Sequence, residues 1–371
     1  MIIQTIFDAV QGDNSKGIVL ISPLDWGLGH ATRCVPLIRI LLSNKFTVLI
    51  AASGPSAILL KNEFPDCIHL SAPEARFLYS RSRRWFALSV IIQIPKLLRL
   101  AKRETAWLRS VCKKYKPDLI ISDNRFGMYH NNIASVFISH QPGLKTGFGE
   151  RIDKLVQKQK FKALNRFTEC WIPDLKGDAA IAGELSNPDF LPKIPVHFIG
   201  LLSRLESVKQ TESGRILILL SGPEPQRTLL EEIISEQLDD VEENIIFVRG
   251  LPSGGPAIRK KDRVTYHDHL DARQLSEAVC MAEFVVCRSG YSSVMDLLKL
   301  GKKGIYIPTP GQPEQEYLAR RLSERNQGIV FRQEDFILKT AIELARSFNF
   351  HLPQIPASDI FLKRVKAMTG S

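Results

Sequence analysis

The chain has 371 residues, 44% of them hydrophobic and 24% charged, which is typical of folded globular proteins and long enough to predict two domains. No run of eighteen apolar residues occurs, which argues against a helix that crosses a bilayer. The net charge of +11 comes from one segment, because residues 76–116 hold twelve basic residues and one acid. The positive charge therefore predicts a single patch and not a generally basic surface.

The amino terminus and the cysteines bear on the cellular compartment. The first residues lack a basic start and include Asp8 and Asp13, which argues against a secretory signal. The six cysteines contain no C-x-x-C pair, so neither a disulfide framework nor a zinc site is indicated. We expect a reduced, cytoplasmic protein.

Strand and helix patterns alternate in the first half of the chain. Short apolar runs predict parallel strands covered on both faces, at 17–22, 45–53, 117–123 and 133–140. Helices are predicted at 32–44 and 55–64. Because proline is tolerated only in the first turn of a helix, Pro36 predicts that the first of them begins near Arg33.

The basic segment 76–116 predicts two helical pieces divided at Pro95. Apolar residues at 94, 97, 98, 101 and 108 form one face, and basic residues at 96, 99, 102, 103 and 109 cover much of the remainder. Such a helix suits an anionic membrane surface or a phosphate-bearing lipid. Nucleic acid is a competing partner, but the segment has no recognised reading motif, so none is expected. A solvated helix pair is the remaining alternative.

The second half repeats the alternation. Strands are predicted at 214–222, 243–250, 283–290 and 303–310, with helices at 225–238, 271–282, 292–301 and 314–326. The whole pattern predicts an α/β fold with two doubly wound, Rossmann-like domains facing a cleft. We place the domains at 1–200 and 201–371 and leave open whether the last helix returns to the first domain. Ligands in such sheets bind at the carboxyl ends of the strands.

A glycine-rich turn, GLGHAT, follows the first strand. Gly27 and Gly29 resemble the start of a dinucleotide fingerprint, but Thr32 stands at the third position and the second strand ends without an acid. No phosphate-binding P-loop motif occurs. His30 therefore has two interpretations: it is a catalytic base that accepts a proton near neutral pH, or it caps the following helix.

Polar residues end the later strands of the first half. Asp123 and Asn124 follow one strand and His140 follows the next, on the same predicted rim as His30. We interpret them as acceptor-side contacts, with loop capping as the alternative. His267 and His269 offer two possible metal ligands without a clear third, so no metal site is expected.

Strand-to-helix turns of the second half are candidates for a donor site. In RSGYSSVMD, backbone N–H groups at a helix start favour an anion, and Asp296 can accept hydrogen bonds from a ribose. Glu314 and Gln315 can hold sugar hydroxyls, and Arg227 can reach a phosphate. Ordinary helix capping, or a solvated arginine, is the alternative in each case.

The segment AEFVVCRSGYSSVMDLLKLGKKGIYIPTPGQPEQEYLA carries all these turns in order over about forty residues. With GLGHATR, it resembles the two-domain glycosyltransferases of GT-B architecture, in the MurG-related, family 28-like branch, and indicates a bacterial relative. The resemblance implies transfer of a hexose from a UDP-sugar to a hydroxyl of a lipid-linked or cell-envelope acceptor. The basic segment 76–116 in turn predicts peripheral contact with an anionic membrane, at the inner face of the plasma membrane.

The same resemblance assigns roles to single residues. It places Asp296 on the ribose and Glu314 with Gln315 on the donor sugar. The donor diphosphate would lie against Gly222, Arg227, Arg288, Ser289, Gly290 and Ser293. His30, with Gly27 and Gly29, matches the loop that approaches the diphosphate and the acceptor.

Metal-independent chemistry follows from a different observation. No D-x-D sequence occurs, and helix N-termini with an arginine can stabilise a leaving diphosphate without a metal, so no cofactor is expected. Two other functions stay open: a UDP-sugar epimerase of the same fold, and a non-catalytic subunit that binds nucleotide-sugars or a membrane.

Overall fold

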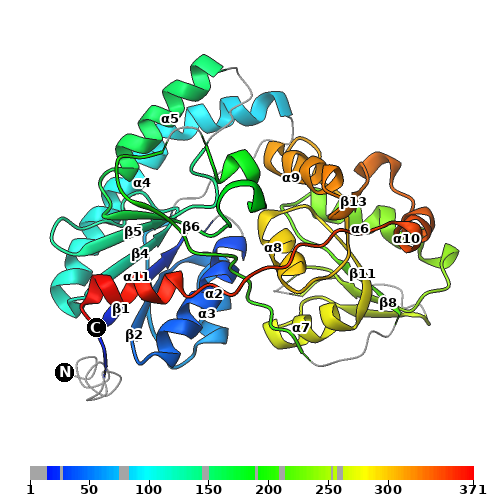
Figure 1. The fold of residues 1–371 in the computed structure, drawn as a ribbon, viewed down its shortest axis with the longest axis horizontal. Coiled ribbons are helices and arrows are strands. Elements are labelled where there is room, and N and C mark those ends of the chain that lie inside the picture. Colours follow the sequence, from blue (N-terminus) through cyan, green and yellow to red (C-terminus); the bar gives the residue numbers. More distant parts are fainter. Residues whose placement is uncertain are drawn as a thin grey trace. The chain divides into compact units, whose positions relative to one another are not determined.

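The computed structural model describes residues 15–25, 28–74, 83–143, 150–188, 191–208, 214–251, 254–256 and 262–371. The side chains of 83–94, 150–153 and 155 are outside this description. The chain divides into two compact units, the first Met1–Leu202 with Pro356–Ser371 and the second Ser203–Ile355 (Figure 1).

The first unit is built on a seven-stranded parallel sheet in the order β3-β2-β1-β4-β5-β6-β7. Its strands are β1 (Ile18–Pro23), β2 (Thr47–Ala52), β3 (Ile68–Ser71), β4 (Leu119–Asp123), β5 (Ala134–Ile138), β6 (Glu169–Ile172) and β7 (Val196–Phe198). Its α-helices are α2 (Leu28–Ser43), α3 (Gly54–Glu63), α4 (Arg83–Tyr115), α5 (Glu150–Leu164) and α11 (Ile360–Thr369). Two short 3₁₀ turns lie at Gly177–Ala179 and Gly183–Leu185.

The second unit has a six-stranded parallel sheet in the order β10-β9-β8-β11-β12-β13. Its strands are β8 (Arg215–Leu219), β9 (Ile245–Val248), β10 (Val264–His267), β11 (Ala282–Cys287), β12 (Gly304–Tyr306) and β13 (Gly328–Val330). Its α-helices are α6 (Gln226–Glu236), α7 (Ala272–Met281), α8 (Tyr291–Lys299), α9 (Pro313–Glu324) and α10 (Leu338–Ser347). Further 3₁₀ turns lie at Leu238–Asp240 and Gln333–Asp335.

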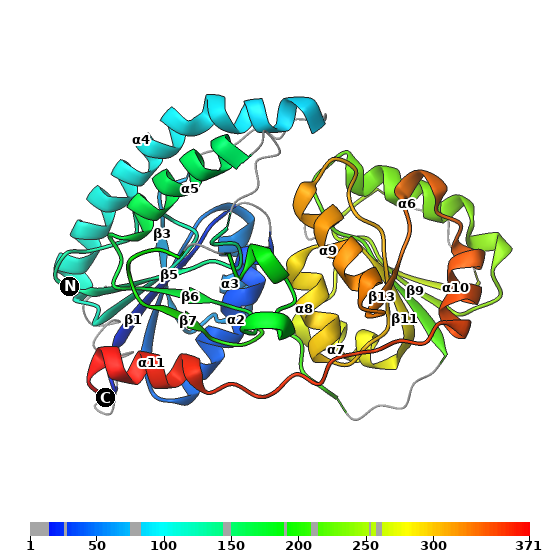
Figure 2. The same ribbon diagram turned by 45° about the horizontal axis from the view of Figure 1, so that its top comes forward.

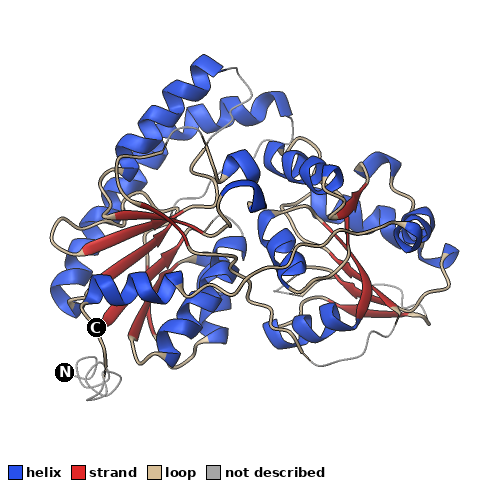
Figure 3. Cartoon of the chain, in the orientation of Figure 1, coloured by secondary structure: helices blue, strands red, loops and turns tan. Residues whose placement is uncertain are grey.

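Both sheets have helices on their two faces, as Figure 3 shows for each unit. The central strands are buried along their whole length, which explains their continuous apolar sequences. In each sheet the strand order reverses beside the first strand, between β1 and β4 and between β8 and β11. This doubly wound order confirms the predicted α/β fold class, and it makes the carboxyl ends of those strands the expected ligand sites.

Two sequence predictions about helices are wrong. Helix α2 begins at Leu28, not near Arg33, so Pro36 lies in its interior. The buried contacts of the first turn, described below, outweigh the loss of one backbone hydrogen bond at the proline. The basic segment is likewise a single helix, α4, which continues through Pro95 where a division was expected.

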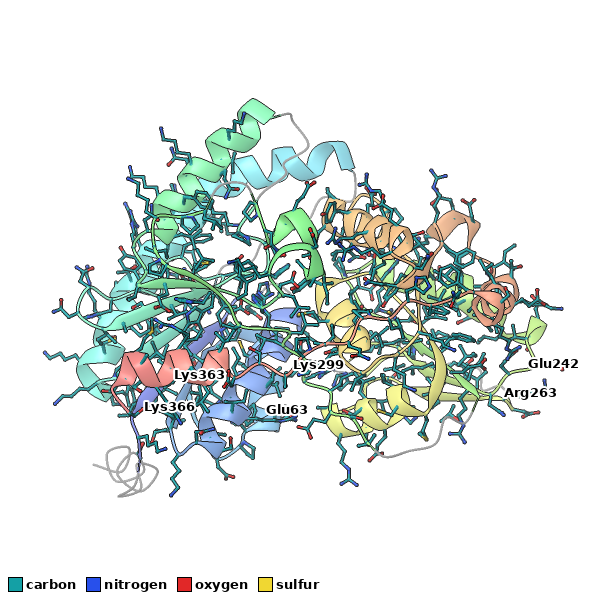
Figure 4. All side chains as sticks on the ribbon, in the orientation of Figure 1. Glu63, Glu242, Arg263, Lys299, Lys363 and Lys366 are labelled. Carbon is teal, nitrogen blue, oxygen red and sulfur yellow. The ribbon has the colours of Figure 1, made fainter. Side chains whose placement is uncertain are left out.

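The last helix, α11, packs on the first sheet although it follows the second unit in sequence (Figure 1). Phe361 is buried and meets Trp171 of β6 edge to face, with ring centroids 5.6 Å apart. Arg364 forms an ion pair with Glu169. On the same helix, Lys363 and Lys366 are labelled in Figure 4. The division at Leu202 and Ser203 lies close to the expected Gly200, whereas residues 356–371 belong to the first unit and not to the second domain assigned to 201–371.

Helices α4 and α5 lie side by side along the first unit (Figures 1 and 2). The exposed cations of α4 among its described side chains are Lys96, Arg99, Lys102, Arg103, Arg109, Lys113 and Lys114. The single acid of the segment, Glu104, is buried against Arg125, with 2.9 Å between its Oε1 and Nε of Arg125. Helix α5 adds exposed lysines at 154, 158 and 162, spaced to share one face. Among the described side chains of this helix pair, the exposed charged residues are therefore all basic.

Candidate active site

The carboxyl edge of the first sheet gathers a buried polar cluster. Asp123 ends β4 and is fully buried, and β5 ends two residues before His140. His30 and Arg33 lie one turn apart at the start of α2, which follows β1. Since β1, β4 and β5 are neighbours in the sheet, their ends bring these four side chains together.

Arg33 holds the cluster together. Its Nε donates to Oδ2 of Asp123 at 2.7 Å, and its Nη2 contacts Oδ1 of the same carboxylate. Nη2 also lies 2.5 Å from Nδ1 of His30, and Nη1 lies 2.7 Å from Nδ1 of His140. The Nδ1 atom of His30 is 3.2 Å from Oδ2 of Asp123. The guanidinium is buried and makes a planar, two-pronged contact with the carboxylate, the geometry for which arginine is suited.

The charges of the cluster set its protonation. Burial raises the pKa of Asp123, but the positive charge and the hydrogen bonds of Arg33 outweigh this and hold it at about 2. Burial lowers the pKa of His30, and the charge of Arg33 lowers it further, against the opposing effect of Asp123. The arrangement therefore keeps Asp123 ionised and His30 neutral at pH 7.

Of the remaining acceptor-side residues, the structure describes Asn124 and Gly29 but not Gly27. Asn124 takes a left-handed backbone conformation, with φ of 58°, and its amide lies 3.4 Å from Oδ1 of Asp123. Gly29 is the second residue of α2, and its carbonyl accepts from the Thr32 hydroxyl at 3.0 Å. Gly27 lies outside the described residues. The structure thus brings His30, Asp123, Asn124 and His140 together, as the sequence predicted.

In the second unit, the loops after β8, β11 and β12 meet. The hydroxyl of Ser289 donates to the carbonyl of Gln315 at 2.9 Å, and the side-chain carbonyl of Gln315 accepts from the backbone N–H of Thr309 at 2.9 Å. A Cβ built on Gly222 would lie 3.9 Å from the hydroxyl of Thr309. The φ of Gly222 is +104°, a conformation that favours glycine. The three predicted donor-side turns therefore share one edge of the sheet.

Arg288 forms hydrogen bonds that connect these loops. It is 1% exposed, and its Nη2 donates to the carbonyl of Gln226 at 2.7 Å and to Oε1 of Gln333 at 2.6 Å. Its Nη1 donates to the carbonyl of Ile307 at 3.2 Å. Burial lowers the pKa of Arg288 to about 10, which leaves it charged at pH 7. The residue is a buried cation that fixes the turns around it.

Two buried polar atoms near these turns have no hydrogen-bond partner in the described part of the chain: Nε of Arg288 and Oγ1 of Thr309. Native proteins rarely leave such groups unsatisfied, and an absent ligand is one common reason. Gly290 caps α8, and a Cβ built there meets nothing within 4 Å. The edge therefore combines a helix N-terminus, open space and unsatisfied donors.

Arg227 is neither a solvated arginine nor aimed at open space. It is buried, with Nε 2.5 Å from Glu224 and Nη1 2.5 Å from Glu231. Arg249 joins the same network through Glu231 at 2.5 Å and Asp268 at 2.7 Å. To reach a phosphate, Arg227 would have to give up contacts to both glutamates.

Asp296 lies one turn into α8, after the half-buried Ser293. Burial raises the pKa of Asp296 to about 6, although the hydrogen bond with Ser203 and the charges of Arg204 and Lys299 oppose this. Lys299 follows on the same helix and is labelled in Figure 4. Glu314 occupies the first turn of α9 beside Gln315. Asp296 is thus a carboxylate that titrates close to neutral pH.

Sequence reasoning missed three residues of these sites. Arg33 had a usable signal, because residues three apart on a helix share a face and His30 was already a candidate. Thr309 sits in a proline-rich loop where nothing in the sequence separates it from a turn residue. Arg249 follows a strand, and only the fold reveals that it shares Glu231 with Arg227.

Comparison with known proteins finds a match to a family model over part of the chain. Residues 259–361 match the glycosyltransferase family 28 C-terminal domain. Over 260 residues, the chain is 21% identical to the UDP-N-acetylglucosamine–N-acetylmuramyl-(pentapeptide) pyrophosphoryl-undecaprenol N-acetylglucosamine transferase of Histophilus somni, covering 65% of this chain and 67% of that protein.

Solved structures share the fold. The glycosyltransferase of kitacinnamycin superposes with a TM-score of 0.61 at 15% identity, covering 95% of this chain and 94% of its own. The spinosyn rhamnosyltransferase SpnG, complexed with thymidine diphosphate, gives 0.57 at 14% identity, covering 95% and 92%. At these identities, the superpositions show a shared fold.

The buried pair generates a stability prediction. Asp123→Asn leaves Arg33 without its counter-charge and should lower the free energy of unfolding by about 3–5 kcal/mol at pH 7. Urea denaturation followed by tryptophan fluorescence measures this for the first unit alone, because all four tryptophans precede residue 203. The exposed Asp66→Asn is the matched control and should change stability by less than about 0.5 kcal/mol.

The same pair predicts a pH dependence. The pKa of Asp123 in the folded protein, about 2, lies below the ordinary value of 3.8, so its ionised form stabilises the fold above pH 3.8. That contribution is lost as the pH falls towards 2, and the difference between wild type and Asp123→Asn should shrink over this interval. A difference below about 1 kcal/mol at pH 7 would contradict the buried ion pair.

Proposed function

Since the chain is a MurG-related glycosyltransferase of GT-B architecture, we propose that it moves a hexose from a UDP-sugar to a hydroxyl of a lipid-linked or cell-envelope acceptor. The observation that supports a donor site is the meeting of the loops that follow β8, β11 and β12 at the carboxyl edge of the second sheet. There, an N-terminal helix cap, open space and unsatisfied buried donors coincide. The proposal includes catalysis without a metal.

The chemistry of that edge fits a nucleoside diphosphate. The leaving diphosphate develops negative charge, which the N-terminus of α8 and the buried cation Arg288 would stabilise. Gly222, Gly290 and Ser293 would line the phosphates, and the unsatisfied hydroxyl of Thr309 would donate to one of their oxygens. One structural neighbour was solved with thymidine diphosphate, which supports a ligand of this class.

The sugar and the ribose would lie on neighbouring turns. Asp296 would accept hydrogen bonds from the ribose hydroxyls, and Glu314 with Gln315 would hold hydroxyls of the transferred sugar. Gln315 is already fixed by Thr309 and by Gln312, whose Oε1 accepts from its amide at 2.6 Å. A side chain held in this way is suited to orienting a ligand, because little freedom is lost on binding.

The acceptor would be held by the first unit, with His30 as the candidate catalytic residue and Asp123, Asn124 and His140 around it. The basic pair α4 and α5 would contact anionic lipid. Among the described residues, no helix is both long and apolar enough to span a membrane. Leu98 is 61% exposed among the cations of α4, the mixture expected of a helix that rests on a bilayer surface.

Donor binding tests the proposal through Asp296. A nucleotide-sugar that binds only the folded state raises the melting temperature, so UDP-, GDP- and dTDP-sugars are screened by thermal shift. We expect a UDP-sugar to bind about tenfold more weakly at pH 5 than at pH 7, because Asp296 is protonated below about pH 6. Asp296→Asn should weaken binding at pH 7 and remove the pH step.

The exposed Asp335→Asn in the same unit is the matched control and should keep both the affinity and its pH dependence. Unaltered donor binding by Asp296→Asn would remove Asp296 from the ribose site. No stabilisation by any nucleotide-sugar would count against the donor proposal as a whole.

Membrane contact is tested by flotation with vesicles of phosphatidylcholine and phosphatidylglycerol. Each basic residue near an anionic surface contributes about 1 kcal/mol, so Lys102→Glu with Arg103→Glu should lower partitioning at least about thirtyfold. Lys61→Glu with Lys339→Glu changes the net charge equally at exposed positions away from α4 and should float like wild type. Equal flotation of both double variants would contradict membrane contact by α4 and support a solvated helix instead.

A further inference from the structure

One guanidinium contacts two imidazoles at the same ring position. Nη2 of Arg33 lies 2.5 Å from Nδ1 of His30, and Nη1 lies 2.7 Å from Nδ1 of His140. Arginine has five N–H donors, no acceptor, and a charge that it keeps in proteins. An imidazole nitrogen that it contacts must therefore be the acceptor and carry no proton.

For His30, Asp123 competes for the same nitrogen. Its Oδ2 lies 3.2 Å from Nδ1 and, as an ionised carboxylate, can only accept. Nδ1 cannot donate to Asp123 while it accepts from Arg33. The contact to Arg33 is shorter by 0.7 Å, and Oδ2 is already satisfied by Nε of Arg33 at 2.7 Å. The geometry favours acceptance from Arg33.

We propose that Arg33 is a positioning residue that holds both His30 and His140 in the tautomer protonated at Nε2. In this tautomer the edge of each ring opposite Nδ1 presents an N–H donor. His30 then offers a hydrogen bond to an acceptor oxygen of the ligand instead of taking a proton from a hydroxyl. The hydrogen bond to a ligand rests on the proposed function, whereas the tautomer of the two imidazoles does not.

The surroundings of the pair agree with a neutral, donating imidazole. The charged and titratable groups that face His30 are Arg33, Asp123 and His140, and Arg33 and His140 act against its protonation. The side chain of His30 is 15% exposed, so a ligand has access to it. Within the described part of the chain, Nε2 of His30 makes no hydrogen bond, which leaves this donor available.

Long-range proton–nitrogen correlation NMR on protein labelled with ¹⁵N-histidine reads the tautomer directly, without substrate. Signals are assigned with His30→Gln and His140→Gln. We expect both residues to show an unprotonated Nδ1 and a protonated Nε2 at pH 7. Free histidine in the same buffer serves as the reference for an imidazole that samples both tautomers. Protonation of His30 at Nδ1, the pattern for a donor to Asp123, would overturn the proposal.

A variant tests whether Arg33 is the cause. In Arg33→Met, Asp123 is the remaining partner of Nδ1, and His30 should change to the tautomer protonated at Nδ1. Arg39→Met, on the same helix but paired with Glu63 at 3.2 Å, should leave both tautomers as in wild type. An unaltered tautomer in a folded Arg33→Met would refute the positioning role, and if that variant does not fold, the wild-type spectrum still decides the tautomer. A failure of glycosyl transfer would not change any of these spectra.

Discussion

The first unit depends on one buried ion pair, between Arg33 and Asp123. It joins the start of α2 to the end of β4, at the point where the strand order of the sheet reverses. A buried pair adds little net stability, because desolvation offsets the attraction, but it fixes geometry, because either charge left alone is costly. The pair explains why α2 begins at Leu28 in spite of Pro36 and why His30 and His140 lie against the same guanidinium.

The second unit meets a similar requirement in another way. Arg288 is buried at the switch point of its sheet, and within the described residues it donates to carbonyl and amide oxygens of the loops around it, not to a carboxylate. The positive charge is therefore not neutralised by those contacts and acts on whatever occupies the edge above it. A diphosphate would gain from that charge, whereas the neutralised guanidinium of Arg33 offers orientation. Arg288 thus suits the second unit to binding an anion, and Arg33 suits the first unit to orienting its histidines.

The fold could be predicted because its main signals are local. Apolar runs marked the central strands, and polar strand ends marked the edges where Asp123, His140, Arg288 and Asp296 lie. What failed depended on contacts between distant residues. The continuation of α4 through Pro95 contradicts a local rule. The return of α11, which the sequence left open, depends on Phe361 meeting Trp171, 190 positions earlier in the sequence. Arg227, predicted as a phosphate ligand, pairs locally with Glu224 and Glu231, and the fold adds the distant Arg249 to this network.

Glycosyl transfer from a nucleotide-sugar to a lipid is tested most directly by measuring the transfer of a radiolabelled sugar. The protein is incubated with a UDP-sugar radiolabelled in the sugar, a bacterial lipid extract and EDTA. The radioactivity of the organic phase is counted, and the released UDP is measured separately. We expect label to enter the lipid phase with an equal amount of UDP released, and both to require the acceptor. Conversion of the sugar to an epimer without lipid labelling, or donor binding with no UDP released, would contradict it.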